Sequence, residues 1–310
     1  MRPDTLILVN PAAGQGRARQ QQAAVADYLA AQGQRIEFSE TQDSEDVRQQ
    51  AQDAAAGGVR LVVALGGDGT VHHLIEGLLG TPAAAGILPT GSGNDVARSL
   101  GIPLDPIRAA DTLLRAHPHP IDIVRARFAN AHTAHFIAAG GMGLDAEAAD
   151  RANTIFRRWP GVTRYLAGAF TAFADGATFE LRATLDGRSW SGRALLAVVA
   201  NGPYYGSGVH IAPAARMDDG YFDVLLVRDV SWARLVEAIP ILLSSGDLRF
   251  QEIERCRCRS LRLETDRPVK VHGDGEFLGE SPAQFEIVPK AVCVMVPRLS
   301  DGAIDRERLG

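Results

Sequence analysis

Short apolar runs alternate with helix-like segments over the first 125 residues of the chain. Each run has the length of a buried strand, whereas the segments between them place apolar residues at helical spacing, and two of them end at glycine. Regular alternation of strands and helices predicts a mostly parallel sheet with helices on its faces. The predicted strands are 5–9, 35–38, 61–65 and 85–88, and the predicted helices are 17–32, 44–57, 71–79 and 105–117.

The pattern changes near Ile121, where paired strand signals replace the alternation. The stretches 178–185 and 189–200 flank Asp186-Gly187, a pair typical of a tight hairpin turn. Further strands are predicted at 125–128, 133–138, 221–227, 260–264, 269–272, 284–288 and 292–296, with helical insertions at 163–174 and 231–243. This half is therefore expected to form a largely antiparallel, β-rich sandwich.

Together these patterns predict an α/β protein of two domains, which is also what a length of 310 residues favours. Residues 1–125 are expected to form an N-terminal α/β domain with a mostly parallel sheet. Residues 126–297 are expected to form a C-terminal antiparallel β-rich sandwich domain. The tail at about 298–310 is a candidate to pack back on the first domain.

The composition is that of an ordinary globular protein, with 46% hydrophobic and 22% charged residues. A net charge of -5 argues against a nucleic-acid partner, because such proteins usually carry a basic surplus. No apolar run approaches the roughly 18 residues needed to span a bilayer, and no leader segment is expected. The odd set of three cysteines, Cys256, Cys258 and Cys293, indicates a reducing cytoplasm rather than a disulfide framework.

Three glycine-rich loops follow three of the predicted parallel strands, at 10–16, 66–70 and 89–95. Loops at the carboxyl ends of parallel strands converge on one crevice, and glycine lets backbone N–H groups approach an anion closely. The P-loop motif and lysine are both missing from this half, so phosphate is expected to be held by backbone N–H groups, hydroxyls and a metal ion. Asp68 suits a metal partner or an acid or base beside a polyphosphate; a plain strand–helix turn is the alternative.

Other polar residues carry no such signal by themselves. Asp274-Gly275-Glu276 and Asp218-Asp219-Gly220 are ordinary turns by sequence, and only their combination with the glycine-rich loops gives them a chemical interpretation. His72 and His73 begin the helix after Thr70. One packed and one solvated histidine is the favoured interpretation, with a metal or acid–base role as the alternative.

These motifs resemble those of the bacterial diacylglycerol kinase-like lipid kinases, relatives of the eukaryotic diacylglycerol and sphingosine kinases. The resemblance spans nearly the whole chain. It rests, in order, on Asn10-Pro11-x-x-Gly14, Gly66-Gly67-Asp68-Gly69-Thr70, 89–95, 136–145, 202–213, 218–223 and Asp274-Gly275-Glu276. It implies an ATP-binding α/β domain followed by a β-rich domain that carries the lipid substrate and a metal site.

The resemblance also implies roles for individual residues. Glu276 would be the general base, with Asp68 as a second catalytic carboxylate. Asp219, with the backbone carbonyls of Arg216 and Tyr221, would bind Mg²⁺; Asp68 and Asp95 would link that site to the nucleotide metal, with Asp122 behind it. The residues expected to contact ATP are Asn10, Pro11, Gly14, Thr41, Gly66, Gly67, Asp68, Gly69, Thr70, Ser92 and Asn94. Ala13 and Ala138 depart from the family, which often has Ser and Asn there.

The resemblance therefore predicts an ATP- and Mg²⁺-dependent lipid kinase that phosphorylates a hydroxyl of a diacylglycerol-like, phosphatidylglycerol-like or sphingoid lipid. One alternative is a kinase like the NAD kinases, which share Gly-Gly-Asp-Gly-Thr, although 94–95 and 274–276 look like the lipid kinases. The other is a nucleotide-binding regulator without turnover, against which the intact Asp68, Asp95, Asp219 and Glu276 argue.

An insoluble substrate implies contact with a membrane surface. Arg151, Arg157, Arg158 and Arg164 lie near Trp159 and an apolar stretch, a combination that favours anionic headgroups; a solvated basic face is the alternative. The expected location is cytoplasmic, peripheral to the inner face of the membrane. The oligomeric state is left open, with a homodimer as one option.

Overall fold

The N-terminal half is built on four parallel strands in the order β2-β1-β3-β4. The computed structural model of the chain describes residues 4–156, 158–159, 161–176 and 178–298. The four strands are β1 (Thr5–Val9), β2 (Glu37–Glu40), β3 (Leu61–Gly66) and β4 (Ala84–Pro89). Their apolar residues are buried from both sides, as expected of a parallel sheet covered on two faces.

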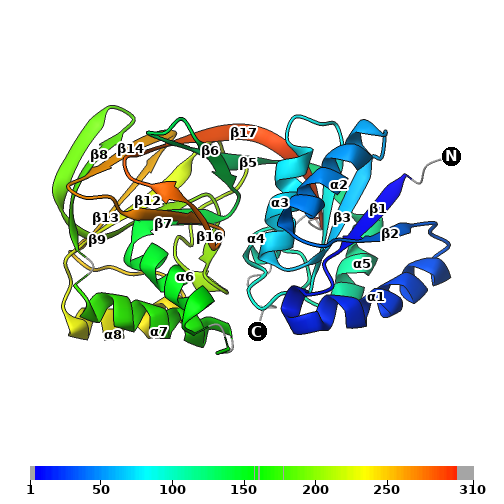
Figure 1. The fold of residues 1–310 in the computed structure, drawn as a ribbon, viewed down its shortest axis with the longest axis horizontal. Helices are drawn as coiled ribbons and strands as arrows, with labels where there is room; N and C mark the ends of the chain where they lie inside the picture. The colour runs from blue at the N-terminus through cyan, green and yellow to red at the C-terminus, as the bar shows by residue number, and fades with distance from the viewer. Residues whose placement is uncertain (1–3, 157, 160, 177, 299–310) are drawn as a thin grey trace.

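Five helices accompany this sheet within the described residues. Helices α2 and α3 lie on one face and α1 and α5 on the other (Figure 1). The bounds are α1 (Ala13–Ala31), α2 (Ser44–Ala56), α3 (Asp68–Leu78), α4 (Asp95–Ser99) and α5 (Pro106–Arg115). Helix α1 begins before the predicted residue 17, and the short α4 was not predicted. Helix α5 ends before the predicted residue 117, where strand β5 already begins.

The C-terminal half is an antiparallel β-rich layer around a second core that includes Phe136, Phe222 and Phe285. Its central strands run in the order β7-β9-β8-β14-β17. The strands are β5 (His117–Phe128), β6 (Thr133–Phe136), β7 (Ala139–Gly143), β8 (Phe179–Leu185), β9 (Arg188–Ala200), β10 (Tyr204–Tyr205), β11 (Val209–His210), β12 (Phe222–Arg228), β13 (Ile253–Cys258), β14 (Ser260–Thr265), β15 (Lys270–Gly273), β16 (Glu276–Glu280) and β17 (Ala283–Val296). Helices α6 (Leu144–Thr154), α7 (Gly161–Ala174) and α8 (Trp232–Leu243) lie together along one edge of this half (Figure 1).

Strands β5 and β17 join the halves, running side by side across the top of the molecule in Figure 1. The two predicted strands at 284–288 and 292–296 are one strand, β17, with an irregularity between Val288 and Val292. Beyond it, Cys293 and Val294 pair in parallel with β4. The sheet is therefore continuous through both halves, and the division at residues 125 and 126 stays a prediction. Residues 299–310 of the predicted tail lie outside the described residues.

None of the described helices combines the length and the apolar character needed to cross a bilayer.

Candidate functional site

The three glycine-rich loops meet at one edge of the parallel sheet. Leu65 is in register with both Val9 and Leu88, so β1, β3 and β4 end side by side. The Asn10 side-chain amide donates to the Thr70 hydroxyl at 3.2 Å, which ties the first loop to the second. The predicted convergence of the loops is confirmed.

At two positions in these loops only glycine fits, because other atoms of the loops lie where a Cβ would stand. A Cβ on Gly14, whose φ is +60°, would stand 2.1 Å from the carbonyl oxygen of Thr90. A Cβ on Gly66 would stand 2.4 Å from the Thr70 hydroxyl. Any side chain at either position would push the loops apart, so these glycines set the shape of the crevice.

Asp68 lies in the first turn of α3, and its carboxylate is hydrogen-bonded to the backbone of the third glycine-rich loop, residues 89–95. It accepts hydrogen bonds from the backbone N–H groups of Asn94 at 2.7 Å and Asp95 at 2.6 Å. Burial and the neighbouring Asp95 charge raise the pKa of Asp68 to about 7. Besides any chemical role, this carboxylate therefore holds in place the loop that ends at Asp95.

Asp95 extends this chain of contacts into the C-terminal half. Its buried carboxylate accepts from the backbone N–H groups of Ser207 at 3.0 Å and Gly208 at 2.7 Å, in the turn between β10 and β11. Burial raises the pKa of Asp95 as well. Two buried carboxylates stand near each other at this edge, and carboxylate oxygens are the ligands that Mg²⁺ prefers, so this donor set fits a divalent cation.

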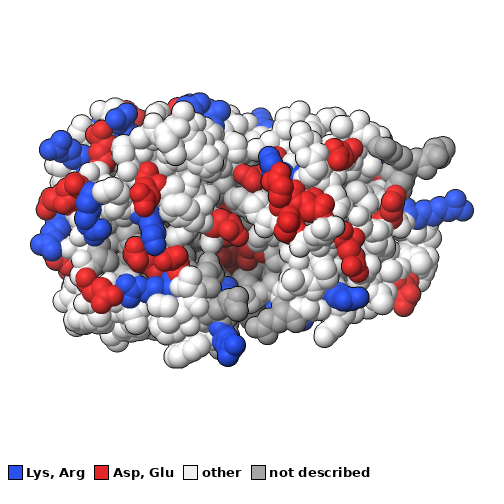
Figure 2. Space-filling model, viewed as in Figure 1, with Lys and Arg blue, Asp and Glu red and all other residues white. Residues whose placement is uncertain are grey.

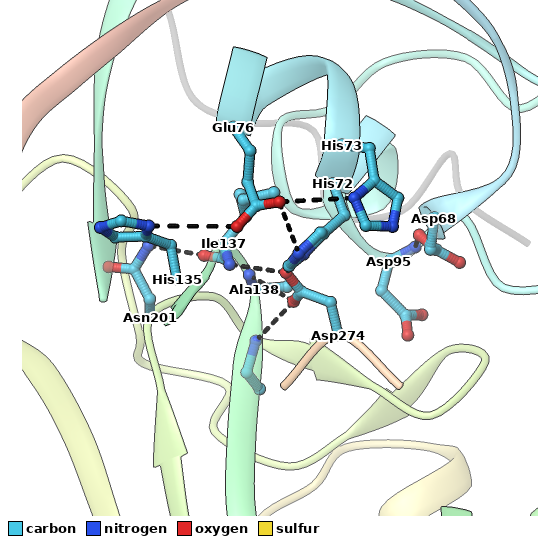
Figure 3. A network of polar contacts seen from close by, with 11 residues as sticks. Asp68, His72, His73, Glu76, Asp95, His135, Ile137, Ala138, Asn201 and Asp274 are labelled. Carbon is cyan, nitrogen blue, oxygen red and sulfur yellow. Dashed lines mark hydrogen bonds and ion pairs between the residues drawn. The ribbon is translucent and has the colours of Figure 1, made fainter. Parts of the chain in front are cut away.

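The turn that carries Glu276 is held in place by Asp274, whose φ of +51° lies in the left-handed region. The Asp274 carboxylate accepts from the backbone N–H groups of Ile137 at 2.7 Å and Ala138 at 2.9 Å, and it faces Nδ1 of His72 at 3.0 Å (Figure 3). Glu276 itself is exposed. Its Oε1 lies 3.5 Å from the point where a Cβ on Gly69 would stand.

A cavity of about 890 Å³ lies where the loops, this turn and the C-terminal helices meet. Figure 2 shows acidic side chains gathered around the hollow between the two halves. One end is polar, lined by Asn10, Gly14, Arg17, Ser44, Gly67, Asp68, Gly69, Thr70, Ser92, Asp95, Asp274, Gly275 and Glu276. The other end is mostly apolar, lined by Leu144, Ala148, Trp159, Leu166, Ala169, Phe170, Leu196, Leu235, Ala238, Ile239 and Leu242.

Some residues predicted to contact ATP do not line this cavity. The hydroxyl of the buried Thr41 donates to the Val9 carbonyl at 3.2 Å. The amide of Asn94 makes two hydrogen bonds of 3.0 Å to the backbone of Gly91 and so shapes the third loop. Pro11 and Gly66 are likewise not among the lining residues.

Sequence reasoning missed one cation at the polar end. Arg17 lines the cavity and donates from its guanidinium to the carbonyl oxygens of Gly14 at 3.0 Å and Gly91 at 3.1 Å. The sequence predicted that backbone N–H groups, hydroxyls and a metal ion hold the phosphate because lysine is missing from this half, but a guanidinium also binds phosphate. The position of Arg17, three residues after the first glycine of the loop, was the available signal.

The residues predicted to bind Mg²⁺ in the C-terminal half lie outside the cavity. The Asp219 carboxylate accepts from the backbone N–H of Tyr221 at 3.1 Å and pairs with the Arg257 guanidinium. Asp122, behind it, accepts from the backbone N–H groups of Gly220 and Lys290, each at 2.7 Å. The assignment of Arg216, Asp219 and Tyr221 as ligands stays a prediction, and Arg257 competes with a metal ion for the same carboxylate.

The chain is similar to known kinases over almost its full length. Residues 4–126 match the family model described as "Diacylglycerol kinase catalytic domain", and residues 138–296 match "YegS C-terminal NAD kinase beta sandwich-like domain". A "Diacylglycerol kinase" of Mycobacterium tuberculosis is 31% identical over 94% of each chain. A "Probable lipid kinase YegS-like" of Pseudomonas aeruginosa is 31% identical over 94% of this chain and 93% of that protein.

Solved structures agree with these matches. The crystal structure of a diacylglycerol kinase from Bacillus anthracis superposes with a TM-score of 0.74 at 27% sequence identity. The superposition covers 94% of this chain and 96% of that one. The two-part architecture is therefore shared along the whole length.

Proposed function

This chain belongs to the diacylglycerol kinase-like lipid kinases, and we propose that it transfers the γ-phosphate of ATP to a lipid hydroxyl with the help of Mg²⁺. The observation that carries the proposal is the cavity, which is polar at one end and apolar at the other, with Glu276 on its polar side. Phosphoryl transfer needs the two substrates positioned, the phosphate charge neutralised and the acceptor proton removed.

The polar end suits a triphosphate. Residues of the glycine-rich loops line it, together with Thr70, Ser92 and Arg17, and these residues offer backbone N–H groups, hydroxyls and a guanidinium. In the proposed complex these groups hold the phosphates of ATP, since backbone dipoles and a guanidinium both attract anions.

Asp68 and Asp95 are the residues that would hold Mg²⁺ with the nucleotide. Both are buried carboxylates that line the polar end, and carboxylate oxygens are the ligands that Mg²⁺ prefers. When bound, Mg²⁺ supplies charge neutralisation at the transferred phosphate. The chain's own contribution is to keep the two carboxylates in place through the backbone of the third loop and of the β10–β11 turn.

Glu276 is the candidate general base. Its exposed carboxylate lies beside Gly69, and Asp274 fixes the turn that carries it. A lipid hydroxyl that enters from the apolar end would meet Glu276 at the polar end. Glu276 would accept the hydroxyl proton as the lipid oxygen attacks the γ-phosphorus, while the bond from that phosphorus to the bridging oxygen breaks and ADP leaves.

The apolar end suits acyl or sphingoid chains. It is lined by side chains of α6, α7 and α8, such as Leu144, Phe170 and Ile239. A diacylglycerol-like, phosphatidylglycerol-like or sphingoid lipid would bury its chains there and present its hydroxyl to Glu276. The dinucleotide acceptor of a kinase like the NAD kinases would place polar groups against these side chains, which the hydrophobic effect disfavours.

Membrane contact belongs to the same proposal, with the protein bound reversibly to the cytoplasmic face of the bilayer. Ile155 and Trp159 are 70% and 51% exposed near the end of α6, and Trp232 and Val236 are 47% and 53% exposed on α8. Arg158 is exposed beside them, Arg151 pairs with Asp175, and Arg157 lies outside the described residues. Apolar side chains beside a cation favour an anionic interface.

Radiolabelled ATP with a panel of lipids in mixed micelles tests the proposal. We expect Mg²⁺-dependent label in at least one lipid that has a free hydroxyl, and none in NAD. Label in NAD alone would favour the small-molecule kinase. ATP binding without label in any acceptor would favour the nucleotide-binding regulator.

A further inference from the structure

A second cluster of ligating side chains lies on α3, on the side of the helix that faces the C-terminal half (Figure 3). His72, His73 and Glu76 each offer one atom, and these atoms lie within 4.8 Å of one another. His135, on β6, approaches the same carboxylate, with its Nδ1 4.0 Å from Oε1 of Glu76. His73 also lines the cavity described above, and none of the three α3 residues is assigned a role in the proposed phosphoryl transfer.

The spacing of these atoms matches a small coordination sphere. Nδ1 of His73 lies 3.4 Å and Nε2 of His72 lies 3.7 Å from the same oxygen, Oε2 of Glu76. A tetrahedral zinc ion with bonds of about 2.0–2.1 Å separates its ligand atoms by roughly 3.3–3.4 Å. Both nitrogens therefore stand near the ligand spacing from Oε2, and all three atoms lie within 4.8 Å of one another, so a small shift of the side chains would place them around one ion.

An independent feature orients the buried histidine. Nδ1 of His72 is paired with the Asp274 carboxylate at 3.0 Å, and the two side chains are only 4% and 2% exposed. This pairing turns Nε2 toward Glu76. A carboxylate on the far nitrogen is the usual partner of a histidine that ligates a metal, because it fixes the ring and strengthens the near nitrogen as a donor.

We propose that His72, His73 and Glu76 form a binding site for a divalent transition-metal ion of the zinc type. Two imidazoles and one carboxylate suit Zn²⁺, whereas Mg²⁺ prefers oxygen ligands and would favour Asp68 and Asp95 instead. His73 and Glu76 are 18% and 23% exposed, so an ion reaches the site from solvent and a water molecule completes its coordination. His72 is buried, as expected of the packed histidine, and His73 is partly exposed; the metal role is the alternative that the sequence left open.

A bound metal ion would also account for the three imidazoles that surround the Glu76 carboxylate. Glu76 has imidazoles of His72, His73 and His135 within 4.0 Å, from two elements of the fold. An ion bound there sits on α3 and, through the His72–Asp274 pair, is coupled to the β15–β16 turn. Binding is therefore expected to stabilise the contact between the two halves of the molecule.

The test is a zinc titration of the full chain, purified without a histidine tag and stripped with EDTA, in competition with a chromophoric chelator. We expect one equivalent of Zn²⁺ to bind, and His73→Ala and Glu76→Gln each to weaken binding by at least about tenfold. His132→Ala is the matched control, because His132 stacks on Phe128 away from the cluster, and it should bind as the unmodified chain does. No saturable binding, or unchanged affinity in both cluster variants, would overturn the proposal.

A second measurement needs no variant. Co²⁺ added to the unmodified chain should give the intense visible absorption of a four-coordinate ion and be displaced by Zn²⁺. The proposal is wrong if only the weak absorption of hydrated Co²⁺ is seen. The Co²⁺ spectrum tests metal binding even if Glu76→Gln fails to fold, and it does not depend on kinase activity.

Discussion

Oε1 of Glu276 lies 3.5 Å from the point where a Cβ on Gly69 would stand. The two residues are far apart in sequence, and they bring the β15–β16 turn onto the glycine-rich loop after β3. Because Gly69 has no side chain, the carboxylate can approach the start of α3 directly. The candidate base and the candidate phosphate loop therefore share one surface of the cavity.

Asp68 should make the ligand-free protein less stable as the pH rises. Burial raises the pKa of Asp68 to about 7 in the folded chain, above the value of about 4 in an unfolded chain. The folded state then retains a proton that the unfolded state releases, so stability is present at low pH and is lost as the pH rises through about 7. The melting temperature should therefore fall as the pH is raised from about 5 to about 7.5.

Asp68→Asn should flatten this dependence, and the exposed Asp53→Asn should leave it unchanged. Equal slopes in all three proteins would show that Asp68 is not the titrating group. Asp68→Ala should also melt at a lower temperature than the unmodified chain, because it leaves the N–H groups of Asn94 and Asp95 without their acceptor.

Removing the Asp274 carboxylate should strongly destabilise the fold. Asp274→Ala leaves the backbone N–H groups of Ile137 and Ala138 and the buried His72 ring without their partner. We expect a loss of about 3 kcal/mol in the free energy of unfolding, measured with urea. Asp266→Ala is the control, since that exposed carboxylate accepts one bond, from Glu180, and should cost less than about 1 kcal/mol. Similar losses in the two variants would contradict this account.

Arg257 should decide whether the Asp219 turn binds Mg²⁺. In the unmodified chain the guanidinium neutralises Asp219, so Mg²⁺ without nucleotide should raise the melting temperature little through this turn. Arg257→Gln frees the carboxylate and should make the melting temperature rise with Mg²⁺. Arg259→Gln is a close control, because the Arg259 guanidinium also stacks on the Tyr221 ring but donates to the Tyr221 hydroxyl, at 3.0 Å. The same Mg²⁺ response in both variants would remove Arg257 from this role.

Membrane binding should depend on the exposed residues near α6 and α8. Ile155→Ser with Val236→Ser should reduce co-sedimentation with anionic vesicles, because both side chains are more than half exposed. Arg158→Glu should lower the preference for anionic over zwitterionic lipid, and added salt should do the same. Leu114→Ser, on α5 in the other half, should bind as the unmodified chain does. Unchanged binding in the double variant would place the membrane contact elsewhere.

The glycine-rich loops could be predicted from sequence because their chemistry is local. Strand, glycine and helix start follow one another in the chain, and parallel strands bring such loops to one edge. The contacts of Asp95 with Ser207 and Gly208 could not be predicted in this way, since no local pattern says which turn a loop carboxylate will meet. The same holds for the pair of His72 and Asp274.

The apolar end of the cavity was missed for a different reason. The apolar residues of α7 and α8 predict helices with one buried face, but periodicity does not say what that face covers. Strand β17 was predicted as two strands because Pro289 and Lys290 interrupt its apolar pattern. Pairing with β5 on both sides of the interruption keeps it one element.

The most direct test of the account is the turnover of Glu276→Gln. This change keeps the size of the side chain and removes its basic oxygen, so we expect kcat to fall by at least about 100-fold with nearly unchanged ATP affinity. Glu280→Gln, an exposed residue of the same strand β16 that does not line the cavity, should keep full activity. If ATP affinity collapses in Glu276→Gln while kcat at saturation survives, Glu276 is a nucleotide or metal ligand, and its assignment as the base is wrong.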